Sequence, residues 1–361
     1  MYQKVPHRKN WSRGWCSVAN HIKVYRRGLR LATWLAVIIT FSGEIRLQQS
    51  NSNSVNYYIS NGRDFVRRAR AVSAVQGYVN LLFFNAAYLP FCQSWICNVR
   101  CMQLTEVINM TLFVAMDELA AATLQRFQPN VNVYLWRRAI ASNASLRYGT
   151  FEYFELTSQR LELQNALIQA KISVLMLEAD ATVFSRTAFD RLPSIFSSVD
   201  IVSADDRGDG LISAGFLLCK SNLRVRRFFQ AYTALYTQKL SELSSKDHRF
   251  TYKYDYGEQH LMTRMLQESH LKVHWLPECE FTRGEWYSSE ELRRRCPAPA
   301  LLQNNYLVGN TEKIHRVKRW KHWFVDESLQ RCTCTRHTAS LLLKNLTDPI
   351  QVRGAVSMDP R

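Results

Sequence analysis

The stretch that decides the fold runs from residue 172 to residue 180. Residues 172–177 read ISVLML, and Glu178-Ala179-Asp180 follows directly. An apolar run of this length favours a strand buried on both faces, as in a parallel sheet. Paired carboxylates at the edge of a core cost desolvation free energy, and a hard divalent cation neutralises both. The stretch therefore predicts a metal site at a strand end, with a helix-capping acidic turn as the alternative.

The same strand pattern recurs earlier in the chain. Apolar runs of strand length occupy residues 78–84, 111–116 and 131–135, and helical patterns occupy 119–127 and 159–170. Strands that alternate with helices indicate parallel crossover units and a sheet covered on both faces. We therefore expect an α/β fold with a mostly parallel sheet, of the Rossmann type. Ligands of such sheets bind outside the carboxyl ends of the strands.

The charge of the chain is unevenly distributed. The 361 residues carry a formal net charge of +17, and clustered Lys and Arg are typical of nucleic-acid binding proteins. Much of the excess lies in residues 1–30, which contain no Asp or Glu. This arm is better explained as a topology signal, so we expect no nucleic-acid partner. The basic residues of the arm are Lys4, Arg8, Lys9, Arg13, Lys23, Arg26, Arg27 and Arg30.

An uncharged apolar run, LATWLAVIITF, follows the basic arm at residues 31–41. It is shorter than the roughly 20 apolar residues of a typical transmembrane helix. A signal anchor over 31–43, a cleaved signal peptide and a buried soluble helix are therefore all open, and we expect the anchor. A basic flank before an apolar run favours a cytoplasmic arm and a translocated remainder. The chain is then a single-pass type II membrane protein.

Two features are compatible with a secretory lumen. Glycosylation sequons begin at Asn109, Asn143 and Asn345, all after the apolar run. The cysteines beyond the run form an even set, as expected for disulfides in an oxidising space, although their connectivity is not readable. A zinc site is the alternative, but the spacings do not give two close cysteine pairs. These cysteines are Cys92, Cys97, Cys101, Cys219, Cys279, Cys296, Cys332 and Cys334.

Changes in composition predict the organisation of the chain. After the arm and the anchor, residues 44–75 are rich in Ser, Asn, Gln and Arg with little apolar periodicity, which indicates a solvated stem. We expect one domain over 76–330 and a tail over 331–361.

Several segments, in the same order, resemble the nucleotide-diphospho-sugar transferase family, which includes plant-type xylosyl, galactosyl and arabinosyl transferases. Glu178-Ala179-Asp180 resembles the Asp-x-Asp motif of GT-A glycosyltransferases. Gly257-Glu258-Gln259 lies where the family has an Asp-Gln pair. The other matching segments are residues 79–85 with Tyr88, 113–117, 200–202, 213–216, and 304–306 with Gly309 and Lys313. The likeness covers residues 78–324.

The resemblance implies a role for each matching residue. It implies metal ligation by Asp180, Glu178 and Gln303, and catalytic contact of Glu258 and Gln259 with the transferred sugar. It implies contact with the nucleotide-sugar for Asn85, Tyr88, Asp117, Glu178 and Lys313, of which Lys313 reaches the diphosphate. It implies a small-residue turn at 213–216 beside the substrates, and the substrate-binding residues are Ser213, Ala214, Gly215, Asn305 and Gly309.

Two departures from the family pattern bear on activity. Glu178 replaces the first aspartate, and Gln303 replaces a metal-binding histidine by a neutral, weaker ligand. The resemblance implies a metal-assisted, retaining glycosyltransferase of the Golgi membrane with a lumenal catalytic domain. Its expected cofactors are Mn²⁺ and a UDP-sugar, and its acceptor is a glycan or glycoprotein. The alternative is a catalytically silent lumenal protein that binds carbohydrate or a partner with the same fold.

An aromatic pair also matches the family. Trp286 and Tyr287 resemble a family loop near the acceptor, although aromatic residues more often belong to the core.

Overall fold

The computed structural model of the chain describes residues 52–137, 145–206, 208, 210–244, 257–328 and 330–334, without the side chains of 52–61 and 244. The predicted anchor at 31–43 and the sequon residues Asn143 and Asn345 lie outside these residues. None of the described helices is both long and apolar enough to cross a membrane. Residues 1–60 separate from Asn61–Arg361 as a compact unit, and the account below concerns the second unit.

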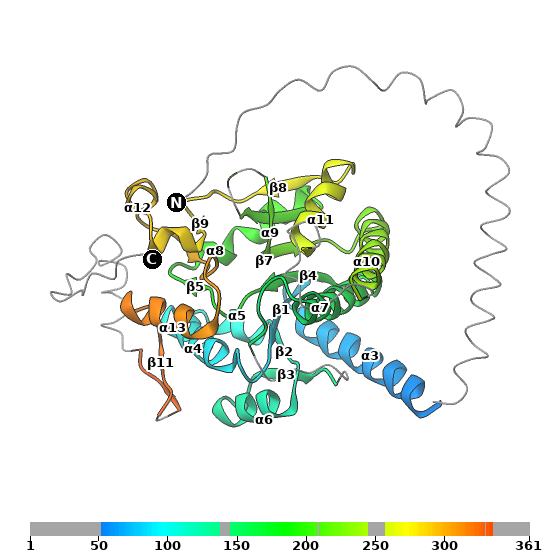
Figure 1. The fold of residues 1–361 in the computed structure, drawn as a ribbon, viewed down its shortest axis with the longest axis horizontal. Helices are drawn as coiled ribbons and strands as arrows, with labels where there is room; N and C mark the ends of the chain where they lie inside the picture. The colour runs from blue at the N-terminus through cyan, green and yellow to red at the C-terminus, as the bar shows by residue number, and fades with distance from the viewer. Residues whose placement is uncertain are drawn as a thin grey trace, which may run out of the picture. The chain divides into compact units, whose positions relative to one another are not determined.

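A seven-stranded sheet forms the centre of the described unit (Figure 1). Its strand order is β3-β2-β1-β4-β7-β6-β8, and only β7 runs antiparallel to its neighbours. The expected α/β class with a mostly parallel sheet is confirmed at this level. The strands are β1 (Tyr78–Phe84), β2 (Thr111–Ala115), β3 (Asn132–Leu135), β4 (Ser173–Leu177), β6 (Ile201–Asp205), β7 (Ile212–Cys219) and β8 (Val273–Trp275).

Helices cover both faces of the sheet. Alternate residues of a strand point to opposite faces, and apolar side chains on both faces are buried under these helices. Leu82 packs into one core cluster and Leu81, its neighbour in β1, into the other. The first cluster includes residues of α4 (Leu89–Cys101), α5 (Thr105–Asn109), α6 (Glu118–Phe127), α8 (Thr187–Asp190) and α9 (Leu192–Ser198). The second includes residues of α3 (Ser52–Ser73), α7 (Phe151–Gln169), α10 (Leu223–Ser244) and α11 (Glu258–Gln267).

The C-terminal part adds small elements around a third apolar cluster, which includes Phe184, Trp286 and Phe324. Strand β10 pairs antiparallel with β5, which follows Asp180 closely, so the chain returns to the end of β4 at Gln303. These elements are β5 (Thr182–Val183), β9 (Phe281–Thr282), η3 (Gly284–Tyr287), α12 (Glu290–Arg295), β10 (Leu301–Leu302), α13 (Asn310–Arg319), β11 (Val325–Asp326) and β12 (Arg331–Cys332).

Six cysteines form disulfides. For these residues the predicted disulfides are therefore confirmed, and the alternative of a zinc site is not. Cys97 pairs with Cys332 and Cys101 with Cys334, so two bonds tie α4 to the C-terminal hairpin across separations of 235 and 233 residues. Cys279 pairs with Cys296. Cys92 and Cys219 are buried free thiols.

Two local expectations are wrong. The predicted solvated stem at 44–75 contains the whole of helix α3, in which Phe65 and Ala69 are fully buried. Their i, i+4 spacing was masked by the surrounding Asn and Arg residues, and the Phe65 ring packs 5.0 Å from that of Tyr134. Ser213-Ala214-Gly215 lies inside strand β7 and not in a turn, because β7 pairs with β6 on both sides of this segment, at Ile212 and at residues 217–219, and with β4 from Phe216 onward.

Candidate active site

The end of β4 carries a buried ion pair. Lys313 Nζ lies 2.6 Å from Asp180 Oδ2, and the two side chains are only 14% and 3% exposed. Asp180 comes directly from the strand end, whereas Lys313 lies in the first turns of α13, which begins after Gly309 at a φ of 93°. Burial alone would lower the pKa of Lys313, but the charge of Asp180 outweighs it, and the pKa lies above its usual value. A protonated ammonium therefore stands beside the carboxylate.

Glu178, two residues earlier, lies in a different electrostatic environment. Burial and the neighbouring charge of Asp180 raise the pKa of Glu178 to about 7, against the opposing influence of Arg160 and Lys313. The guanidinium of Arg160, from α7, lies 3.8 Å from Glu178 Oε1. A carboxyl group with this pKa is partly protonated near neutral pH, and it loses its proton when a further positive charge binds nearby.

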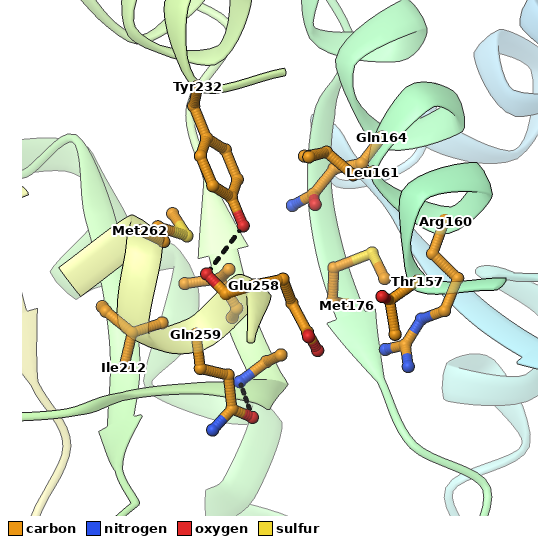
Figure 2. Close-up of a pocket in the computed structure, with 12 residues that line it drawn as sticks. Thr157, Arg160, Leu161, Gln164, Met176, Ile212, Tyr232, Glu258, Gln259 and Met262 are labelled. Atoms are coloured by element: carbon orange, nitrogen blue, oxygen red, sulfur yellow. Dashed lines mark hydrogen bonds between the residues drawn. The ribbon is translucent and has the colours of Figure 1, made fainter. Parts of the chain in front are cut away.

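Arg160 also faces a second carboxylate. A small cavity of about 30 Å³ is lined by Arg160, Glu258, Gln259 and Tyr232, among others, and Figure 2 shows the Glu258 carboxylate pointing toward the Arg160 side of this cavity. Burial raises the pKa of Glu258, and Arg160 opposes the shift. The phenol of Tyr232 donates to the Glu258 backbone carbonyl at 2.8 Å, which fixes the start of α11. Arg160 is thus placed between the two acids.

Gly215 allows two side chains of the site to lie against the sheet. A Cβ added at Gly215 would lie 2.7 Å from Glu178 Oε2 and 2.8 Å from Gln303 Nε2. Strand β7 runs antiparallel to β4, so Gly215 in the early part of β7 lies beside the end of β4. Gln303 Nε2 donates to Ser213 Oγ at 2.9 Å, which places the amide over the same strand. Glu178 and Gln303 are therefore close neighbours above Gly215.

A second carboxylate hub forms where β6 ends. Asp206 is buried and accepts from Asn305 Nδ2 at 2.7 Å through Oδ1. Gln259 Nε2 and the Tyr306 hydroxyl each lie 3.4 Å from Asp206 Oδ2. Gln259 also accepts from the Ala214 backbone amide at 3.2 Å, as Figure 2 shows. Two segments distant in sequence, at Gln259 and at residues 305–306, thus meet at Asp206.

The exits of β1 and β2 are joined to each other and to α13. Asp117 caps α6 through Ala120 N at 2.8 Å and accepts from Ala86 N at 2.7 Å, so its observed contacts position the β1 exit loop. Asn85 Oδ1 accepts from Tyr88 N at 3.0 Å. Asn310 Nδ2 donates to Ala87 O at 2.7 Å, which brings this loop to the start of α13.

Most of the predicted site residues therefore lie around one edge of the sheet. The structure adds two residues that sequence reasoning missed, Arg160 and Asp206. Asp206 had a signal, since it follows an apolar strand and begins the polar, glycine-rich segment 206–210. Arg160 had none, because one arginine on a helix is usually solvated. The expected acceptor aromatics Trp286 and Tyr287 are buried, and their rings pack with Trp320 in the third cluster.

The residues at the end of β4 fit a hard divalent cation by their donor chemistry. Glu178 and Asp180 supply carboxylate oxygens, Gln303 supplies a carbonyl oxygen, and added positive charge would relieve the repulsion that raises the pKa of Glu178. The set is sparse, since no three His, Cys, Asp or Glu side chains converge anywhere in the described part of the chain.

Comparisons with known proteins identify the family of the chain and one relative of similar length. The family model of nucleotide-diphospho-sugar transferases matches residues 106–317, more than half of the chain. A UDP-D-xylose:L-fucose alpha-1,3-D-xylosyltransferase of Arabidopsis thaliana is 21% identical over 334 residues, which cover 85% of this chain and 86% of that protein.

The similar solved structures are remote. The glycosyltransferase GlyE of Streptococcus pneumoniae TIGR4 is 15% identical with a TM-score of 0.40, and the match covers 71% of this chain but only 62% of GlyE. The galactosyltransferase LgtC, solved with donor and acceptor sugar analogues, is 14% identical with a TM-score of 0.41 and coverage of 74% and 96%. Mouse xyloside xylosyltransferase 1 is 13% identical with a TM-score of 0.40 and coverage of 63% and 98%.

Proposed function

Because the chain belongs to the nucleotide-diphospho-sugar transferase family, and is a glycosyltransferase, we propose that it moves a sugar from a UDP-linked donor to a glycan or glycoprotein acceptor. The observation that supports this best is the buried Asp180–Lys313 pair beside Glu178 at the end of a sheet strand. A site that encloses both a carboxylate and an ammonium suits a ligand with both charges, because the carboxylate can face a bound cation and the ammonium a diphosphate.

In this proposal Lys313 binds the diphosphate, since its ammonium lies at the start of α13 next to the acids. Helix N-termini also favour anions through their backbone dipoles. The β1 exit loop with Asn85 and Tyr88 binds the nucleotide, because Asn310 joins that loop to α13. Lys313 then stabilises the charge that develops on the leaving diphosphate, which is the main electrostatic demand of the reaction.

The sugar end of the site is formed by Glu258, Gln259 and the segment 213–215. Glu258 and Glu178 both face Arg160, so the guanidinium orients the acids at the two ends of the donor. A manganese ion bound by Glu178, Asp180 and Gln303 would neutralise charge on the diphosphate. Transfer with retention of anomeric configuration is part of the proposal, and the anomeric proton signal of the product in NMR tests it.

The direct test uses the full chain, because α3 packs into the domain and a shorter chain would lose Phe65. UDP-xylose turnover is measured with and without L-fucose and Mn²⁺, a choice that follows the substrates named for the Arabidopsis relative. Asp180→Asn is expected to lower turnover by about 100-fold or more. Asp64→Asn, at a half-buried carboxylate on α3 that lies outside the site, is the matched control and should leave turnover unchanged. Equal turnover in wild type and Asp180→Asn would contradict the proposal.

The same preparation separates the catalytically silent alternative. A silent scaffold is expected to show no manganese-dependent binding of UDP in a calorimetric titration. The absence of both manganese-dependent UDP binding and turnover of any UDP-sugar would favour that alternative.

We also propose a Golgi membrane location with the signal anchor at 31–43 and a lumenal catalytic domain. Three disulfides support an oxidising compartment. Protease protection of the C-terminal domain in intact microsomes tests this topology, and digestion without detergent would contradict it.

A further inference from the structure

An exposed aromatic side chain lies beside the proposed sugar end of the site. The loop that follows β10 exposes Tyr306 at 48% and Val308 at 63% of their surfaces, although it starts from the buried residues Gln303 and Asn304. Trp286 and Tyr287, the aromatic residues expected near the acceptor, are buried instead. Among the residues that the structure describes, Tyr306 is thus an exposed aromatic side chain near the site that a ligand can reach.

The Tyr306 side chain is fixed in place. Its hydroxyl donates to the backbone carbonyl of Asp206 and lies 3.4 Å from Asp206 Oδ2. Asp206 thus holds the hydroxyl, while the residue as a whole stays 48% exposed. The backbone of Tyr306 has a φ of 58°, the left-handed region that aromatic residues rarely adopt. Such strained residues cluster at ligand sites, where the surrounding structure imposes their conformation.

The position of the ring follows from contacts that it shares with the site. Asp206 Oδ2 lies 3.4 Å from both the Tyr306 hydroxyl and Gln259 Nε2, so these two side chains are neighbours. Asn305 donates to the other oxygen of Asp206. Gln259 borders the cavity that contains Glu258. An exposed aromatic residue, a carboxylate and two amides therefore gather beside Gln259 and Glu258, which form the proposed sugar end of the site.

We propose that Tyr306 is the stacking platform for the acceptor, which is a pyranose that presents an apolar C–H face to the ring. Aromatic side chains provide a large apolar surface with fixed geometry, and the few polar groups of a pocket orient the ligand. Asp206 accepts from hydroxyl groups of this sugar, and the amides of Asn305 and Gln259 bind beside it. This inference rests on the proposed function, since it assigns the acceptor side of the same site.

The test measures sugar and nucleotide binding separately on the full chain. Methyl α-L-fucopyranoside, methyl β-D-galactopyranoside and methyl β-D-glucopyranoside are titrated by saturation-transfer NMR in the presence of UDP and Mn²⁺. Tyr306→Ala removes the ring, and Tyr306→Gly removes it with a backbone that adopts positive φ without strain. Tyr306→Phe keeps the ring without the hydroxyl. Trp275→Ala removes another exposed aromatic, on β8, and serves as the matched control.

The expected result is a loss of affinity for the preferred glycoside of about tenfold in Tyr306→Ala and Tyr306→Gly. Tyr306→Phe and Trp275→Ala should stay within about threefold of wild type, and UDP affinity should not change in any variant. Wild-type affinity in both ring-less variants, or no glycoside binding by wild type that binds UDP, would overturn the platform. Failure of wild type to bind UDP would instead refute the proposed function, so the two failures are distinguishable.

Discussion

The two ends of the candidate site differ in how they treat charge. The charged end consists of Glu178, Asp180, Lys313 and Arg160, whose ionisable groups lie close together with little exposure. The amide end consists of Asp206 with Gln259, Asn305 and Gln303, where neutral amides gather near one carboxylate. At the charged end, a charged ligand can replace the ion pair between Asp180 and Lys313. At the amide end, hydrogen-bonding groups can position a neutral ligand.

The largest expected effect on the free energy of unfolding follows from loss of the Asp180 charge, and a second variant separates this effect from the effect on turnover. Asp180→Asn leaves Lys313 buried without its counter-charge, and we expect a loss of about 3 kcal/mol in the free energy of unfolding. The double variant Asp180→Asn/Lys313→Met should regain most of this stability without regaining turnover. Chemical denaturation measures both variants. A single variant as stable as wild type would show that the ion pair is not enclosed as the structure has it.

The next effect concerns His322, a buried residue that lines the same small cavity as Asp180. Burial lowers the pKa of His322 from 6.5 to about 3, so the folded protein keeps the ring neutral while the unfolded chain takes up a proton below pH 6.5. Stability is therefore complete above pH 6.5 and is lost as the pH falls toward 3, by about 2.7 kcal/mol at pH 4.5.

The control for this prediction is His322→Gln, which keeps a hydrogen-bonding group near the Tyr287 hydroxyl that lies 3.0 Å from His322 Nδ1. The difference in stability between wild type and this variant should shrink on acidification. This comparison isolates His322 from Glu178, whose raised pKa acts in the opposite direction, with stability lost as the pH rises through about 7. A difference that is constant from pH 7.5 to 4.5 would refute the assignment.

At the amide end the expected effect is smaller. Asp206→Asn keeps the shape but turns one acceptor oxygen into a donor that faces other donors, so we expect a loss of about 1.5 kcal/mol. UDP affinity should be unchanged because the charged end is untouched, while turnover with an acceptor should fall. Loss of UDP binding in this variant would show that the two ends are not separable.

The smallest expected effect lies where the two ends meet. Gly215→Ala places a methyl group against the flexible side chains of Glu178 and Gln303, which can move, so stability should fall by only about 1 kcal/mol. Turnover should fall about tenfold or more, because displacement of Glu178 misplaces the donor. Gly62→Ala, where nothing lies within 4 Å of the added carbon, is the matched control for both measurements.

The sequence predicted the regular half of the fold well. Strand β1 has the predicted bounds, and β2 and β4 end within one residue of them, because strands buried on both faces are unbroken apolar runs. The two-residue strands β5, β9 and β10 have no pattern of their own, since they are too short for any periodicity. Helix α3 was missed because one narrow apolar stripe lies among polar residues.

The sequence by itself determined that two acids follow a core strand and that a lysine lies in a basic segment more than a hundred residues later. Only the tertiary structure decided that Lys313 neutralises Asp180, that Arg160 faces both Glu178 and Glu258, and that Asp206 collects side chains from distant segments. The physical reason is that these contacts depend on how β10 pairs with β5 and on the antiparallel direction of β7. Backbone pairing between remote segments sets those positions, and no local periodicity records it.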